Sequence, residues 1–196
     1  MLKKIFYIVP LFAVLLGFGL HIIKSKNENP ISPINPNGAT ISPIKIDFYS
    51  QGDSRWAKKN LGSTSDIMSN SGCTVCCIAM VLSTKNIRLQ PGELNDKLIS
   101  NEGFTKNGWV KWEKIQPASS INVGPIFNSH QNIVSSLNAG HPVIAKVFLY
   151  GTVQHWVLII GMKNGRYLIA DPLDNSISEK YIDQLSEKIY STRTIK

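Results

Sequence analysis

Cys73 is the residue of this sequence whose position most clearly indicates chemistry. It follows Ser71 and Gly72, which can cap and turn the start of a helix, and the stretch 75–83 after it is apolar on nearly every face. We therefore predict a fully buried helix with Cys73 in its first turn. There the positive end of the helix dipole and the unpaired N–H groups favour the thiolate, the nucleophilic form of cysteine. A small buried hydrophobe that happens to be cysteine fits this stretch equally well, so other residues must decide.

The three cysteines of the chain, at positions 73, 76 and 77, all lie in this predicted helix. Their spacing puts them on one flank of the helix, where bridges among them would be strained. We expect no disulfide framework, so the thiol of Cys73 remains free. The Cys-x-x-Cys pattern occurs once, without a second ligand pair at metal-site spacing, and we expect neither a metal nor a cofactor.

His155 and Asp171 lie at the open end of a predicted β-hairpin. His155 opens one apolar run, and Asp171 follows a second run over 166–170, with turn residues at 163–165 between them. A three-residue turn with Gly165 in the left-handed conformation would pair Val157 with Asp171. His155 would then lie one diagonal step from Asp171 on the same face, within side-chain reach. A two-residue turn would place them on opposite faces, and we predict the three-residue turn.

Cys73, His155 and Asp171 together have the residue types of a thiol acyl-transfer site. A cysteine at the tip of a buried helix attacks, a histidine takes its proton, and an aspartate holds the tautomer of the imidazole. Alone, His155 is typical of a strand edge and Asp171 of an ordinary Asp-Pro turn, but the set favours one site. His130 and His141 have no acid at hairpin spacing after them, and we expect surface or structural roles for both.

The remaining elements must position these residues. Apolar periodicity and turn residues predict helices before sheet, which indicates an α+β fold with helices packed on a C-terminal antiparallel sheet. The expected elements are a short strand at 46–49, a turn at 51–56, a loop at 58–70, the buried helix to 83, a helix from 91 ending before Gly103, a helix at 128–139, strands at 142–150, 155–161 and 166–170, and a last helix at 179–189.

The N-terminal part of the chain predicts export. Residues 5–23 are apolar except for one histidine, and lysines flank them on both sides. We expect residues 1–26 to be an uncleaved membrane anchor or a removed signal peptide, so that the protein is held at the cell membrane with its domain outside, or is secreted. Repeated prolines over 27–45 predict an extended linker, and residues 46–196 form the predicted domain.

The charge of the chain does not favour nucleic-acid binding. The formal net charge of +8 includes four lysines within residues 1–26 and no acid there, which leaves +4 for the remainder. No basic stripe interleaved with aromatic residues is present in the sequence. The weak positive excess suits an anionic cell envelope, and we expect no nucleic-acid partner.

An ordered set of motifs over about residues 46–190 resembles the family-39-like cysteine peptidases. These are relatives of the bacteriocin-processing, or double-glycine leader, peptidases, and their fold is papain-like. The resemblance implies that Cys73 is the nucleophile, His155 the general base and acid, Asp171 the orienting residue, and Gln51 a candidate oxyanion donor beside the Cys73 N–H. The motifs are Gln51-x-Asp53-x-x-Trp56, Gly72-Cys73, Pro142-Val143-Ile144, His155-Trp156-Val157 and Asp171-Pro172.

Two features depart from the family pattern. Thr74-Val75-Cys76 stand where Gly-Pro and a small residue usually follow the cysteine, so packing behind the nucleophile differs. Gln51 lies 22 residues before Cys73 instead of close to it. Ordering of the turn that contains Asp53 and Trp56 therefore suits Gln51 nearly as well as an oxyanion role.

We therefore predict an exported cysteine peptidase that hydrolyses an amide bond of a peptide or cell-wall peptide through a thioester on Cys73. Two alternatives remain open. One is a catalytically inactive papain-like module that binds the cell envelope, and the other is a peptidoglycan amide hydrolase or transpeptidase.

Overall fold

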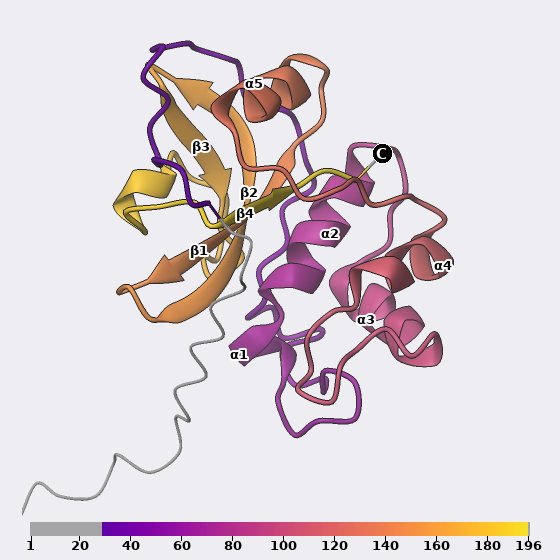
Figure 1. Ribbon diagram of the computed structural model, residues 1–196. Helices are drawn as coiled ribbons and strands as arrows, with labels where there is room; N and C mark the ends of the chain where they lie inside the picture. The colour runs from indigo at the N-terminus through magenta and orange to yellow at the C-terminus, as the bar shows by residue number, and fades with distance from the viewer. Residues whose placement is uncertain (1–28, 196) are drawn as a thin grey trace, which may run out of the picture.

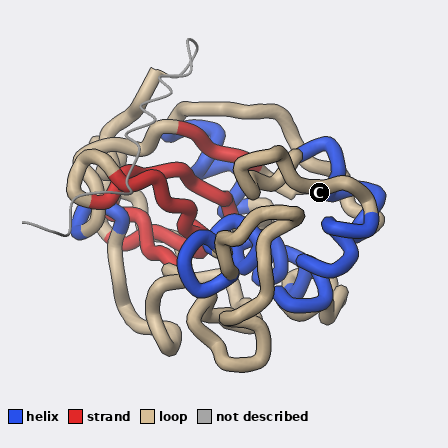
Figure 2. Tube along the Cα trace, turned by 90° about the horizontal axis from the view of Figure 1, so that it is seen from below, coloured by secondary structure: helices blue, strands red, loops and turns tan. Residues whose placement is uncertain are grey.

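The computed structural model describes residues 29–195, in which helices pack against one antiparallel sheet (Figure 1). Seen from below, the strands lie together on one side and most helical segments on the other (Figure 2). The α+β class predicted from the order of the elements is confirmed. Segment 5–23, predicted to enter the membrane, lies outside the described residues; within 29–195 no helix has the length and apolar character to span a bilayer.

The sheet contains four strands in the order β3-β2-β1-β4, and every neighbouring pair is antiparallel. The elements in chain order are α1 (Met68–Ser71), α2 (Cys73–Ser83), α3 (Pro91–Ser100), the 3-10 helix η1 (Trp112–Lys114), α4 (Ile115–Ser119), α5 (His130–Asn138), β1 (Val143–Leu149), β2 (Val153–Lys163), β3 (Arg166–Ala170), the 3-10 helix η2 (Ile182–Gln184) and β4 (Ser191–Arg193).

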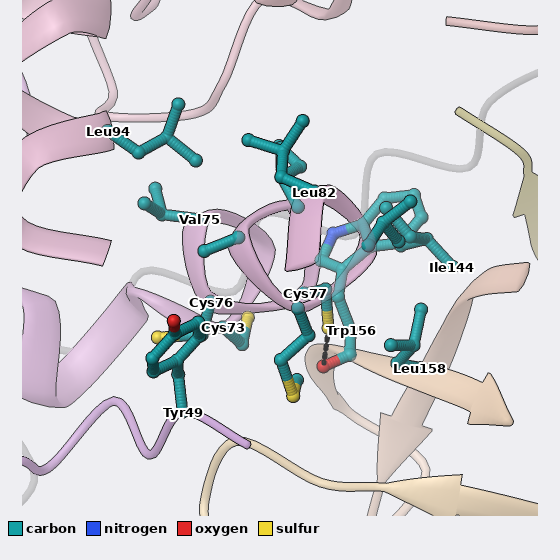
Figure 3. Close-up of a cluster of buried hydrophobic side chains, with 14 of the residues drawn as sticks. Tyr49, Cys73, Val75, Cys76, Cys77, Leu82, Leu94, Ile144, Trp156 and Leu158 are labelled. Carbon is teal, nitrogen blue, oxygen red and sulfur yellow. Dashed lines mark hydrogen bonds between the residues drawn. The ribbon is translucent and has the colours of Figure 1, made fainter. Parts of the chain in front are cut away.

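Helix α2 is buried on nearly all sides, as its apolar sequence predicts. It lies between α3 and β2, and its side chains pack among those of both neighbours (Figure 3). Nine of its eleven residues are buried, which leaves no solvated face. Such a helix is held in place by the core, so the position of Cys73 at its first residue is fixed.

Gly72 permits the sharp junction between α1 and α2. An added Cβ at this position would lie 2.4 Å from the carbonyl oxygen of Met68, closer than any real contact. The Gly72 N–H donates to this same carbonyl at 2.8 Å. Only glycine therefore lets α1 end and α2 begin with Cys73 in the next position.

The second face of the sheet is covered by α5, η2 and the N-terminal segment 31–44. This segment is extended, as its prolines predict, but it lies along the domain and is not a free linker. Ile31 bridges to Ile189, and Ile41 bridges to Met162. Three isoleucines of the two Ile-Ser-Pro-Ile copies, at 31, 41 and 44, pack against the core on this face of the sheet, whereas Ile34 is 42% exposed.

Two predicted elements are absent from the described structure. Residues 46–49 form no strand, and the predicted helix over 179–189 contains only the short 3-10 helix η2. After η2 the chain becomes extended, because Ile189 bridges to Ile31 and β4 then pairs with β1. The apolar periodicity at 182, 185 and 189 thus reflects burial against the sheet without a helix. The predicted elements α2, α3, α5 and β1–β3 are confirmed within a few residues at each end.

Candidate active site

Cys73 is the first residue of α2 and is 7% exposed. The first intrahelical backbone bond runs from the Cys76 N–H to the Gly72 carbonyl at 3.0 Å. The N–H groups of the residues before Cys76 thus have no carbonyl one turn earlier in the helix, and the N-cap Gly72 has no side chain to bind them. The thiol consequently lies beside the positive end of a long, buried helix.

The predicted three-residue turn of the β2–β3 hairpin is wrong. The predicted pairing of Val157 with Asp171 nevertheless results, from a two-residue turn and a bulge. The turn has two residues, Asn164 at φ 52° and Gly165 at φ 81°, and Lys163 pairs with Arg166. A β-bulge between Ile159 and Gly161 then shifts the register by one residue, so that Leu158 pairs with Ala170. Continued by one residue, this register places Asp171 opposite Val157.

His155 and Asp171 are in direct contact. The His155 Nε2 and the Asp171 Oδ1 lie 2.7 Å apart, and the two residues are only 3% and 1% exposed. The second oxygen of Asp171, Oδ2, accepts a hydrogen bond from the Lys180 Nζ at 2.7 Å. The Leu173 N–H donates to Oδ1 at 3.0 Å, so the carboxylate is held from three directions.

These contacts determine the charges of the pair. Burial raises the pKa of Asp171, but the hydrogen bonds from His155 and Lys180 outweigh it and lower the pKa to about 2. Burial lowers the pKa of His155, whereas its hydrogen bonds with Asp171 and Cys73 raise that pKa to about 9. Because Asp171 occupies Nε2, the nitrogen that remains for Cys73 is Nδ1. The structure therefore brings together the three residues that the sequence indicates.

Gln51 lies beside this group, with its side-chain amide already in use. Its backbone N–H donates to the carbonyl of Pro172 at 2.8 Å, and its side-chain Nε2 donates to the carbonyl of Ser69 at 2.7 Å. Its Oε1 is buried and has no hydrogen-bond partner among the described residues. Only the second Nε2 hydrogen is therefore free for another acceptor.

The turn that follows Gln51 is ordered by other groups. The Asp53 carboxylate accepts the backbone N–H of Arg55 at 3.0 Å, and the Trp56 indole donates to the carbonyl of Ser50 at 2.8 Å. The side chain of Gln51 points to Ser69 and makes no hydrogen bond within the turn. The alternative role of Gln51 in ordering this turn thus has no contact that supports it.

Comparison with known proteins decides the family. The model of the peptidase C39-like family matches residues 43–194, which is most of the chain. The chain belongs to the peptidase C39-like family. The chain is also similar to the mesentericin transport/processing ATP-binding protein MesD of Leuconostoc mesenteroides. The two are 30% identical over 136 residues, which are 69% of this chain and 16% of MesD. A solved structure described as a C39-like peptidase of Bacillus anthracis is similar with a TM-score of 0.51 at 15% identity, over 81% of this chain and 98% of that one. This likeness agrees with the papain-like α+β fold.

Lys180 is the residue beside this group that sequence reasoning missed. Its ammonium joins Asp171 at 2.7 Å to Asp174 at 2.9 Å and is largely buried. The lysine lies in a loop nine residues after Asp171, and no motif or periodicity of the C39-like domain marks it. A basic residue shortly after the Asp-Pro turn is the only signal in the sequence.

The core of the C39-like domain accommodates Thr74-Val75-Cys76, the residues that differ from the family pattern. Val75 and Cys76 are fully buried, and Cys77 donates its thiol to the carbonyl of Trp156 at 3.5 Å (Figure 3). Burial raises the pKa of Cys76 and of Cys77 well above the ordinary value, so both remain neutral thiols. They fill the helix interior, and Cys73 is the cysteine that adjoins a base.

Other candidate ligands do not converge. Among residues 29–195 no group of three or more His, Cys, Asp or Glu side chains is arranged to hold a metal ion. His130 hydrogen-bonds with the hydroxyl of Tyr167 at 2.7 Å, and burial lowers its pKa. This histidine links α5 to β3 on the other side of the sheet and has a structural contact.

Proposed function

We propose that this chain is a cysteine peptidase that hydrolyses peptide bonds with Cys73, His155 and Asp171. The observation that carries the proposal is the buried imidazole of His155, which hydrogen-bonds with the carboxylate of Asp171 and whose pKa is raised by Asp171 and by the neighbouring Cys73. A base fixed between a nucleophile and an orienting acid is what nucleophilic acyl transfer requires. Membership of the C39-like family supports the same reaction class.

In the first half of the reaction, the Nδ1 of His155 carries the proton given up by the Cys73 thiol, which agrees with the raised pKa of His155. The sulfur forms a bond to the carbonyl carbon of the substrate, and the carbonyl oxygen becomes an oxyanion. We propose the Cys73 N–H and the hydrogen of the Gln51 amide that Ser69 does not accept as the donors that stabilise it. His155 then gives the proton to the departing amine, and a thioester on Cys73 remains.

In the second half, a water molecule attacks the thioester while His155 removes a proton from the water. The C–S bond breaks, the carboxylic acid leaves, and the proton returns to the sulfur of Cys73. Asp171 keeps the imidazole oriented through both halves by its hydrogen bond to Nε2. Lys180 neutralises the far side of the carboxylate, which keeps Asp171 ionised in the protein interior.

The substrate class follows from the family and from the relative. The name of MesD describes transport and processing, and the chain covers only a small part of that protein. We therefore propose a peptide substrate for this chain. We further propose that residues 1–26 direct the domain to the outside of the cell membrane, as the apolar run 5–23 predicts.

The experiment compares the full-length chain with two cysteine variants on a broad library of linear peptides. Cys73→Ala should abolish cleavage, because it removes the nucleophile. Cys77→Ala is the matched control, since it lies on the same helix but contacts only the Trp156 carbonyl and the core. Equal cleavage by wild type and Cys73→Ala would refute the proposal. Mass spectrometry of acid-quenched wild type should detect an acyl group on Cys73.

A further inference from the structure

Within the part of the chain that the structure describes, the guanidinium of Arg193 in β4 forms no ion pair with a carboxylate. Its Cζ lies 4.7 Å from the ring centroid of Trp112, and its Nε is buried without a hydrogen-bond partner among residues 29–195. Arg55 and Arg166, in contrast, are paired with Asp53 and Asp183. Burial also lowers the pKa of Arg193. The partly buried cation of Arg193 thus has an aromatic face beside it but no acceptor.

A buried donor of this kind is unusual. Removing a charged group from water costs free energy unless an opposite charge or hydrogen bonds compensate for it. An unsatisfied buried polar group in a native protein needs an explanation, which an ordered water, an ion or a ligand can supply. A guanidinium binds a planar carboxylate best, through two parallel N–H···O bonds.

A pocket of about 490 Å³ opens directly onto Arg193. Its lining includes Trp112, the amide residues Gln116 and Asn122, and Gly124 and Pro125. This lining, with an aromatic residue, two amide residues and a guanidinium, is suited to bind a short polar side chain that ends in a carboxylic acid. Residues 112–125 form one wall and β4 the other.

Glu113 is the one carboxylate that lines this pocket. Its charge raises the pKa of Arg193 from a distance, but the two residues form no ion pair within 4.0 Å. Glu113 is exposed, so water screens its charge. It therefore leaves the Nε of Arg193 unsatisfied, and it would repel an acidic ligand in the same pocket.

Trp112, which lines the pocket, packs against Trp156 of the strand that also carries His155. The rings of Trp112 and Trp156 lie 5.1 Å apart, and Trp156 follows His155 directly in β2. The carbonyl of Trp156 also accepts the thiol hydrogen of Cys77, one helical turn after Cys73. Trp156 thus packs between the helix that carries the nucleophile and the wall of the pocket.

We propose that this pocket is a specificity subsite in which Arg193 binds a carboxylate of the peptide substrate, from an aspartate or glutamate side chain or from a chain terminus. The proposal rests on the proposed function, because it names the substrate class of the same site. Binding of the acid supplies the acceptor that the Nε lacks, with Trp112 stacked on the guanidinium plane.

The test uses the full-length Cys73→Ala variant, which binds peptides without turning them over. It is exposed to two octapeptide libraries, one with both termini blocked and one with a free carboxyl terminus, in which each position carries Glu or Gln in matched pairs. Bound peptides are identified by mass spectrometry. We expect acidic peptides, or free-terminus peptides, to be enriched about tenfold over their neutral partners at low salt.

Two further substitutions test whether Arg193 causes the preference for acidic peptides. Arg193→Met in the Cys73→Ala background keeps a stem over Trp112 and should remove the enrichment. Glu113→Gln removes the competing charge and should increase it. The proposal is overturned if the Cys73→Ala protein enriches Glu and Gln peptides equally. It is also overturned if adding Arg193→Met leaves the enrichment of acidic peptides unchanged. A lower unfolding temperature in Arg193→Met with unchanged enrichment would overturn it as well, since that result indicates a structural cation–π contact.

The two proposals fail in distinguishable ways. If wild type cleaves peptides from the library without any preference for acids, the subsite is refuted and the peptidase stands. If wild type cleaves none, while Cys73→Ala still selects acidic peptides through Arg193, the catalytic proposal fails and the carboxylate subsite stands.

Discussion

The carboxylate of Asp171 binds the Nε2 of His155 at 2.7 Å and so determines which nitrogen of the imidazole is left for Cys73. Both residues are almost completely buried, and water does not compete for this bond. The proton that moves in the proposed reaction is thus restricted to Nδ1. The orientation of the histidine therefore depends on a residue that touches neither the nucleophile nor the substrate.

Asp171→Asn should lower the cleavage rate on the order of 10²- to 10⁴-fold. The amide keeps the size of the side chain, but it loses the charge that raises the pKa of His155, and its NH₂ group favours the wrong tautomer. The measurement is kcat/KM on one cleaved peptide, with a thermal unfolding curve to show that the variant folds. A rate within threefold of wild type would remove Asp171 from the mechanism.

Stability should be highest between about pH 4 and pH 6.5, because the pKa values of the pair are shifted apart. The pKa of His155 is raised from 6.5 to about 9, so its stabilisation is complete below pH 6.5 and is lost as the pH rises through 9. The pKa of Asp171 is lowered from 3.8 to about 2, so its stabilisation is present above pH 3.8 and is lost as the pH falls through 2.

Chemical unfolding from pH 2 to pH 10 measures this profile. Cys73→Ala is the control, since His155 then loses one of the groups that raise its pKa and the decline at high pH should begin earlier. An unfolding free energy that stays constant from pH 6 to pH 10 would contradict the shifted pKa of His155.

Lys180→Met should destabilise the domain by about 1–2 kcal/mol and shift the acid limb of the rate profile to higher pH. The lysine is one of the groups that lower the pKa of Asp171, and its loss leaves a buried oxygen without its donor. Lys163→Met provides a matched control, because Lys163 pairs with Glu179 on the surface. If both variants behave alike, Lys180 has no special role beside Asp171.

The sequence predicts the fold class and the residues of the site better than it predicts how they meet. The apolar run of α2 is identified as a helix because Ser71 and Gly72 before it can supply a cap and a turn. The approach of His155 to Asp171 was expected from a three-residue turn, whereas it results from a two-residue turn and a bulge at 159–161. Bulges depend on packing between strands, and the only local sign of this one is Gly161 inside the apolar run.

Long-range contacts account for most of what the sequence did not indicate. Segment 31–44 becomes part of the domain only because the sheet offers it edges at Ile189 and Met162. Strand β4 has three residues and forms only beside β1. The contact of Arg193 with Trp112 likewise joins positions far apart in the sequence, which neither composition nor periodicity contains.

Gly72→Ala should destabilise the domain by about 2–4 kcal/mol and suppress the reaction of Cys73 with iodoacetamide at pH 6. The added Cβ would lie 2.4 Å from the Met68 carbonyl oxygen, so the junction between α1 and α2 must shift, and with it the thiol. Gly52→Ala is the control, because its Cβ would meet only the Ser50 Oγ at 3.7 Å. Cys76 and Cys77 are buried with raised pKa values and should not react, so the label reports on Cys73 alone. Unchanged stability and labelling in Gly72→Ala would show that the tip of α2 tolerates a shift, and that the exact position of Cys73 is not fixed by this glycine.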